Sequence, residues 1–122
     1  LSRDIVNGEA DKAYSTLNNL FKLHEEPTII LATLAKAYID MYRASAIKEK
    51  GISPKELTEI FPSSYRGKEF VITNASKDGQ RYSIPQFHKA LDALSNADKA
   101  IKNSNQDEQQ ILEELILRLL RI

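Results

Sequence analysis

The sequence contains no cysteine and only four glycines. Without cysteine the chain can form no disulfide, no thiolate zinc site and no cysteine nucleophile. Four scattered glycines cannot build a phosphate-binding loop, and the patterns Gly-x-x-x-x-Gly-Lys-Ser/Thr and Gly-x-Ser-x-Gly are both missing. We therefore expect no cofactor and no enzymatic activity in this chain.

Long apolar runs are missing as well, because no stretch approaches the ~20 apolar residues that a membrane-spanning helix needs. Residues 1–4 do not resemble a signal peptide, and the chain does not begin with methionine. We expect a cytoplasmic protein without membrane contact, and we interpret the chain as a piece of a longer one.

Neither sign of charge is in excess, since Lys and Arg number 17 and Asp and Glu also number 17. A protein that neutralises many phosphates needs an excess of basic residues, which the whole chain lacks. The charges are nevertheless uneven, because residues 43–89 carry nine basic and five acidic residues. The middle third therefore carries a net charge of +4, nine basic residues less five acidic ones.

Two histidines, His24 and His88, are the only imidazole groups available as metal ligands or bases. Neither lies in a metal-binding spacing such as His-x-x-x-His, and a zinc site needs three or four ligands. We interpret both as loop or surface residues and expect no metal site.

Apolar residues recur at helical spacing along almost the whole chain, and alternation of period two never extends beyond a few residues. In a chain of 122 residues, long enough for one core, this pattern predicts an all-α fold with a single bundle of about five to six helices. The expected helices cover residues 9–23, 27–50, 54–61, 65–76, 84–102 and 107–121. Residues 1–6 resemble the end of a helix that begins upstream.

The expected helix 27–50 has two apolar faces, separated by a narrow polar strip through Lys36, Asp40 and Arg43. A helix with two apolar faces packs on two sides, so we expect it at the centre of the bundle.

A short helix is predicted after Gly51. Ser53 followed by Glu56 forms the pattern of a capping box. Its buried side is expected to hold Leu57, Ile60 and Phe61.

Residues 53–76 have the outline of a helix-turn-helix, with residues 62–64 as the expected turn. Basic side chains lie in and around this outline, namely Lys48, Lys50, Lys55, Arg66, Lys68 and Lys77. A helix that reads DNA presents Arg, Asn or Gln near its start, whereas this one has Gly67 in its first turn and Glu69 next. A small DNA-binding domain using residues 53–76 remains the alternative function.

Asp98 interrupts an apolar stripe in the expected helix 84–102. Because an unpaired buried carboxylate is costly, it needs a partner or a place at the edge of the core. Lys102 follows four residues later, the favourable order for a helical ion pair. We interpret Asp98 and Lys102 as a structural pair, with a ligand-binding acid as the alternative.

The last twelve residues include eight Leu or Ile. Four of them suffice for one buried face, and Leu117 lies among polar residues, namely Glu113, Glu114, Arg118 and Arg121. One interpretation is a deeply buried terminal helix. The other is a strip offered to another protein of an assembly, with Glu113, Leu117, Arg118 and Arg121 as the candidate subunit interface.

A series of short motifs runs in a fixed order along nearly all of the chain. The motifs are Asn7-Gly8-Glu9 with Ala13, Glu25-Glu26-Pro27 with Ile30-Leu31 and Leu34-Ala35, residues 51–60, residues 65–72, and Asp98 with Lys102, Asp107 and residues 112–120. In this order they resemble the C-terminal domain of the DNA polymerase III delta subunit, which belongs to the bacterial clamp loader. Two loop positions depart from that family: Ser63-Ser64 replaces a His-Pro pair, and Asn103-Ser104 replaces a small residue followed by glycine.

The resemblance implies a helical collar domain that assembles with the equivalent domains of the other clamp-loader subunits, tau/gamma and delta prime. It implies that residues 7–122 form this oligomerisation domain and that residues 1–6 end a linker helix from an upstream domain. Contact with the sliding clamp would belong to the missing N-terminal domains. The parent protein would be part of the DNA polymerase III holoenzyme, supporting clamp loading in DNA replication, and direct DNA contact by this chain is not expected.

Overall fold

The computed structural model describes residues 1–103 and 105–122, and this part of the chain is helical without any strand. Eight helices follow one another in the described residues: α1 (Ser2–Val6), α2 (Ala10–Lys22), α3 (Pro27–Glu49), α4 (Pro54–Ile60), α5 (Pro62–Tyr65), α6 (Glu69–Asp78), α7 (Ile84–Asn103) and α8 (Glu108–Leu120). The predicted all-α class is therefore confirmed, with more helices than the five to six expected. Ser104, part of one of the two departures from the family pattern, lies outside the described residues.

Local sequence signals explain where several helices begin. Pro27 occupies the first turn of α3, where its missing N–H costs nothing. Ser53 caps α4, because its Oγ accepts a hydrogen bond of 3.3 Å from the N–H of Glu56. At the start of α7, Ser83 Oγ accepts from the N–H of Gln86 at 3.3 Å, and Gln86 Oε1 accepts from the N–H of Ser83 at 2.8 Å. This reciprocal pair is a complete capping box.

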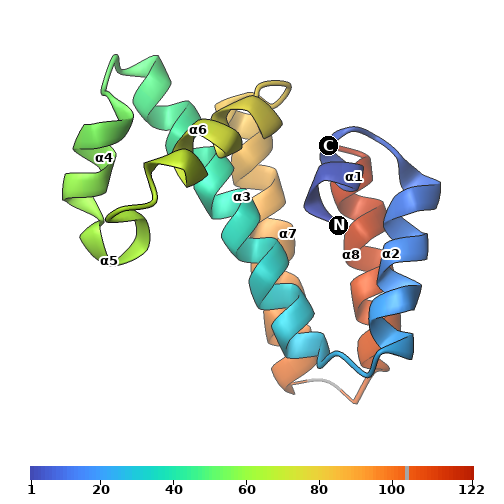
Figure 1. Cartoon of the computed structure of the whole chain (residues 1–122). Helices are drawn as coiled ribbons and strands as arrows, with labels where there is room; N and C mark the ends of the chain where they lie inside the picture. Colours follow the sequence, from blue (N-terminus) through green and yellow to red (C-terminus); the bar gives the residue numbers. More distant parts are fainter. Residues whose placement is uncertain (104) are drawn as a thin grey trace.

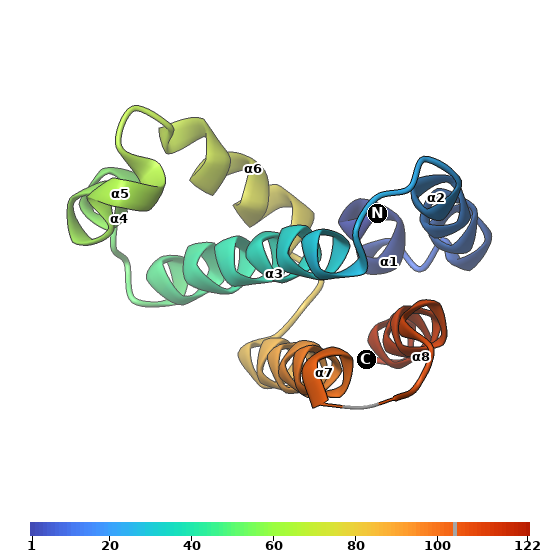
Figure 2. The ribbon, with the colours of Figure 1, turned by 90° about the horizontal axis from the view of Figure 1, so that it is seen from below.

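The long helix α3 lies at the centre of the molecule, as the two apolar faces predicted. It runs obliquely through Figure 1 with α7 alongside, and the view from below shows α6 on one side of it and α7 on the other (Figure 2). Its buried side chains are Ile30, Leu31, Leu34, Tyr38, Asp40, Met41, Ala44 and Ile47. Apolar side chains are thus buried on both sides of α3, and this burial stabilises the fold.

The helices α1, α2 and α8 pack together at the end of the molecule opposite α4 and α5 (Figure 1). The hydroxyl of Tyr14 in α2 donates a hydrogen bond of 3.2 Å to the backbone carbonyl of Glu113 in α8. Burial raises the pKa of Tyr14, an effect to which the charge of Glu113 adds and which the charge of Arg121 opposes. Tyr14 therefore borders the polar side of the last helix.

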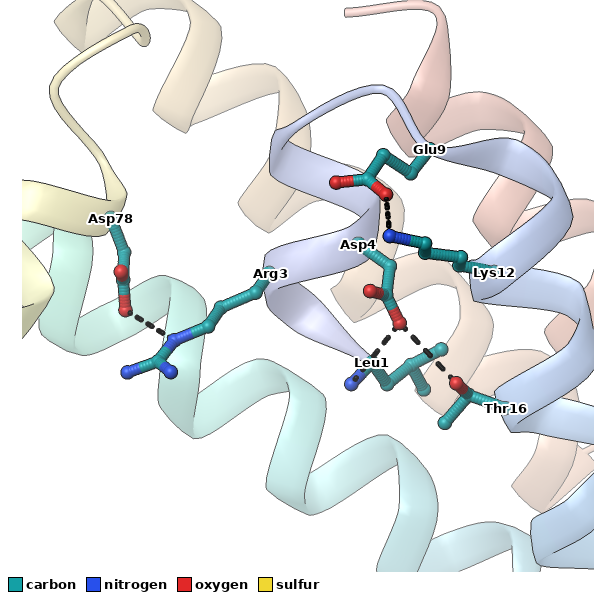
Figure 3. A network of polar contacts seen from close by, with 7 residues as sticks. All are labelled: Leu1, Arg3, Asp4, Glu9, Lys12, Thr16 and Asp78. Carbon is teal, nitrogen blue, oxygen red and sulfur yellow. Dashed lines mark hydrogen bonds and ion pairs between the residues drawn. The ribbon is translucent and has the colours of Figure 1, made fainter.

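Polar contacts also connect α1 to its neighbours (Figure 3). Asp4 Oδ2 accepts a hydrogen bond of 3.3 Å from Thr16 Oγ1 in α2. Arg3 Nε lies 3.2 Å from Asp78 Oδ2 at the end of α6, although Arg3 is 70% exposed. An exposed ion pair contributes roughly 0–1 kcal/mol, so these contacts orient α1 more than they hold it.

Part of the prediction for the short capped helix was wrong. Leu57 is buried and Phe61 is half-buried as expected, but Ile60 is 58% exposed. The helix ends at Ile60, and Phe61 leaves it with φ −122° and ψ 67°. Because the chain bends there, Phe61 packs beneath Arg43 and Ile60 is turned away from the core.

Two further predictions were also wrong, namely a turn at residues 62–64 and a single helix over residues 65–76. Residues Pro62–Tyr65 form the short helix α5, and a separate helix α6 covers Glu69–Asp78. The break lies at Gly67, whose φ of +72° is a left-handed conformation that glycine adopts at little cost. The β-branched segment within residues 69–73 is nevertheless helical, as predicted.

Asp40, predicted on the polar strip of α3, is only 8% exposed. Its Oδ1 accepts a hydrogen bond of 2.6 Å from the Tyr65 hydroxyl, and Lys36 Nζ lies 2.9 Å from its Oδ2. Arg43 donates to the same hydroxyl at 3.2 Å and stacks over the ring of Phe61 at 3.9 Å. Burial and the hydrogen bond to Asp40 raise the pKa of Tyr65. This network fastens α5 to α3.

Candidate subunit interface

The last helix, α8, buries one continuous apolar face against α7, α2, α1 and α3. The buried side chains are Ile111, Leu112, Leu115, Ile116 and Leu119. At 100° per residue these positions occupy one side of the helix. The bundle therefore takes up five of the apolar residues of α8 and leaves its opposite side to solvent.

Leu117 lies on that opposite side and is 42% exposed. Glu113 is half-buried, and Arg121 is exposed. The three residues recur at intervals of four and so form one strip along α8. We call these three residues, together with Arg118, the α8 strip.

Arg118 has a different environment from the rest of the α8 strip. Although exposed, it lines a groove of about 180 Å³ between α7 and α8, together with Ala97, Ala100 and Glu114. The structure thus brings Glu113, Leu117 and Arg121 onto one line and places Arg118 toward α7. A partner that contacts both would have to span the α7–α8 groove.

The structure brings Asp98 and Lys102 together on α7, where Lys102 Nζ lies 2.9 Å from Asp98 Oδ2. The two side chains are 49% and 64% exposed. An exposed pair at this spacing contributes a few tenths of a kcal/mol, roughly 0.2–0.5. Lys102 also lies in the last turn of α7, where a cation interacts favourably with the free carbonyls.

The two histidines lie far apart in the sequence and are both exposed. His24 follows α2 with a positive φ of 60°. His88 Nε2 lies 3.4 Å from the hydroxyl of Tyr42. Among the described residues, no group of three His, Cys, Asp or Glu side chains is close enough to hold a metal ion.

In the part of the chain that the structure describes, no helix combines the length and apolar character needed to cross a membrane.

Sequence reasoning missed an apolar groove along α3, which we call the α3 groove. Its first part, about 380 Å³, lies between α3 and the segment around Leu1 and Leu20. Its second part, about 190 Å³, lies between α3 and α6 and shares Ser2 and Ala37 with the first. The second apolar face of α3 was a signal for it, because the neighbouring helices cover that face incompletely.

Large apolar side chains are exposed at the two ends of the α3 groove. Ile29 at one end is 55% exposed, and Phe70 at the other is 62% exposed. Both exceed Leu117 in exposure. The molecule therefore offers apolar surface on the side of α3 as well as on α8.

The segment interpreted as a possible helix-turn-helix has a different geometry from that outline. The short helix α5 stands between α4 and α6, and Arg66 and Lys68 lie before α6 rather than in its first turn. The acidic Glu69 occupies that first turn. A helix N-terminus with an acid in its first turn is poorly suited to reading base edges beside phosphates.

The chain is similar to known proteins over almost its whole length. The model of the family described as DNA polymerase III delta subunit, C-terminal domain, matches residues 1–119. The DNA polymerase III subunit delta of Bacillus subtilis (strain 168) is 23% identical over 121 residues, covering 99% of this chain and 34% of that protein. The solved structure of the Bacillus subtilis DNA clamp loader delta protein matches with a TM-score of 0.86 and 22% identity, covering 99% of this chain and 34% of that one. The chain thus spans about a third of the length of these relatives.

Proposed function

This chain belongs to the family of C-terminal domains of the DNA polymerase III delta subunit, and we propose that it is a non-catalytic assembly domain of a clamp loader. In this proposal it supports loading of the sliding clamp during DNA replication by holding the delta subunit in its complex. Its partners are the other clamp-loader subunits, tau/gamma and delta prime. Contact with the sliding clamp belongs to parts of the delta protein outside this chain.

The family match over residues 1–119 is the observation that carries the proposal. The surface chemistry supports it, because apolar side chains are exposed on α8 and on both ends of the α3 groove. Apolar surface of this kind is typical of faces that a partner protein covers.

We propose the α8 strip as one contact surface of the assembly. Leu117 supplies the apolar centre, with Glu113 and Arg121 on either side of it along the helix. An apolar residue surrounded by charged ones has the composition of an interface core with a polar rim. The Asp98–Lys102 pair stabilises the end of α7 and is not a contact residue in this proposal.

Deletion of residues 1–122 from the complete delta protein tests the function. The shortened protein is expected to elute separately from tau/gamma and delta prime in size-exclusion chromatography, because the assembly surfaces are gone. The unaltered protein, mixed at the same concentrations, should elute with them. Co-elution of the shortened protein would contradict the proposal.

A titration with duplex DNA separates this function from DNA binding by residues 53–76. In fluorescence anisotropy of a labelled duplex, the complete delta protein and the shortened one should differ little in affinity, because residues 1–122 add no DNA contact. The DNA-binding alternative would be favoured if the complete protein bound the duplex tightly and the shortened protein did not. The affinity of the complete protein should then also fall steeply between low and moderate salt.

A further inference from the structure

A groove of about 290 Å³ lies where the last turns of α3 and α6 meet the start of α4. Its apolar wall is formed by Ala44, Ile47, Ile52, Pro54 and Ile72. At its edges lie the exposed lysines Lys48 and Lys77. We call this cavity the lysine groove, and none of the described side chains that line it is acidic.

The two ammonium groups of the lysine groove are free to meet a ligand. Lys48 lies in the last turn of α3 and Lys77 in the last turn of α6, so they approach the groove from two different helices. In the described residues, neither Lys48 nor Lys77 takes part in a salt bridge, whereas Lys12, Lys36 and Lys102 each do. The surplus of positive charge in residues 43–89 is thus partly gathered around one apolar cavity.

A lysine in the last turn of a helix also interacts favourably with that helix's own carbonyls. This effect accounts for each lysine alone. It does not account for their position on either side of an open cavity walled by isoleucine and alanine. That combination fits a ligand with an apolar group and flanking negative charges.

We propose that the lysine groove binds an acidic peptide segment of another protein, with one large apolar side chain inserted among Ile47, Ile52 and Ile72. Carboxylates on either side of that side chain pair with Lys48 and Lys77. The groove lies on α3, α4 and α6, away from the α8 strip, so this inference goes beyond the assembly function and does not depend on it.

Nucleic acid fits the lysine groove less well than an acidic peptide. A phosphate backbone is bound by cations that follow its track, and it brings no aliphatic side chain to fill an apolar cavity.

Selection from a phage-displayed library of random 12-residue peptides tests the proposal, with the complete delta protein as the immobilised target. We expect enrichment of peptides that place Leu, Ile or Phe between Asp and Glu residues. Labelled synthetic versions should bind in anisotropy measurements. Their affinity should fall about tenfold or more for the double variant Lys48→Glu, Lys77→Glu, since attraction becomes repulsion.

A second variant tests the cavity itself without changing charge. Thr73→Trp places a large ring at the exposed edge of the lysine groove and should also abolish binding. The matched control is the double variant Lys22→Glu, Lys99→Glu, which reverses two exposed lysines elsewhere, one of them in the last turn of α2. It should bind the selected peptides as the unaltered protein does.

Four outcomes would overturn the proposal. They are the absence of any enriched acidic peptide, peptide binding by both groove variants that equals that of the unaltered protein, loss of binding in the control variant, and salt-sensitive duplex DNA binding that the Lys48→Glu, Lys77→Glu variant alone removes. Loss of clamp-loader assembly with intact peptide binding would concern the proposed function only, so failures of the two are distinguishable.

Discussion

The contact between Asp40 and Tyr65 shows what a single residue can do in this fold. A carboxylate with 8% exposure accepts a hydrogen bond of 2.6 Å from a fully buried tyrosine. Buried polar groups are costly unless they are paired, and here the pairing joins α3 to α5. Helical spacing alone predicted Asp40 to lie on an exposed polar strip. Its burial was missed because its partner, Tyr65, lies 25 residues away and no spacing rule reveals such a contact.

We expect Tyr65→Phe to lower the free energy of unfolding by about 1–3 kcal/mol, because it leaves a buried carboxylate oxygen and Arg43 without their shared partner. Urea denaturation followed by circular dichroism measures this change. Tyr42→Phe is the matched control, since the Tyr42 hydroxyl has only a 3.4 Å contact with His88, and its effect should stay within about 0.5 kcal/mol. Equal effects of the two substitutions would contradict the assigned role of Tyr65.

Leu117 illustrates the opposite case, in which position in the sequence was informative. Its neighbours at helical spacing are charged, and the structure leaves it 42% exposed. Whether a partner protein covers it stays a prediction. The exposure of Ile60, by contrast, was missed, because it depends on the bend that Phe61 makes after α4.

At the scale of elements, the long helices and the short capped helix α4 were predictable, whereas the separation of α5 from α6 was not. The starts of α3, α4 and α7 follow local signals, namely proline in the first turn or a capping serine. The division of the segment 62–78 into α5 and α6 depends on the backbone angle of Gly67 and on tertiary contacts of Tyr65. Those contacts exist only once α3 is in place.

The close packing at the end of α6 can be tested at Gly79. Gly79 ends α6, and a Cβ atom there would lie 3.0 Å from Met41 Cβ and 3.0 Å from Phe87 Cζ. We expect Gly79→Ala to lower the free energy of unfolding by about 1–3 kcal/mol through overpacking. Thermal or urea denaturation measures it, with the exposed neighbour Gln80→Ala as control. An unchanged Gly79→Ala protein would show that α6 is free to move away from α3.

The α3 groove could be predicted only in part from the sequence. Two apolar faces on α3 predicted packing on both sides, and α6 and α7 confirm it. The pattern could not show that α1 and α6 leave a strip between them open, because this depends on how far each helix reaches along α3. Ser2 and Ala37 mark the place where the two parts of the groove meet.

For the whole molecule, helical periodicity sufficed to predict the class and the central helix. The arrangement of α4 and α5 on one flank and α1, α2 and α8 on the other could not be derived from periodicity (Figure 1). It follows from which faces meet across the chain. Tyr14 of α2 meets α8, and Arg3 of α1 meets Asp78 at the end of α6 (Figure 3). Periodicity also could not identify the family. The short motifs predicted it through their resemblance to the delta subunit, and the match over residues 1–119 confirms it.

We propose that this domain assembles with other clamp-loader subunits through surfaces that include the α8 strip. A charged side chain in place of Leu117 would bury an unpaired carboxylate in any interface formed there, which is strongly unfavourable. In the free domain the same change is tolerated, because the position is 42% exposed. Ile60→Asp is the matched control, an apolar residue 58% exposed on α4.

The most direct measurement is size-exclusion chromatography with light scattering of the complete delta protein, mixed with tau/gamma and delta prime, for the Leu117→Asp and Ile60→Asp variants. We predict that Leu117→Asp elutes largely apart from the complex while keeping its helical circular dichroism and melting temperature, and that Ile60→Asp elutes within it. A Leu117→Asp protein that is folded and joins the complex as fully as the unaltered one would contradict the assignment of the α8 strip to assembly.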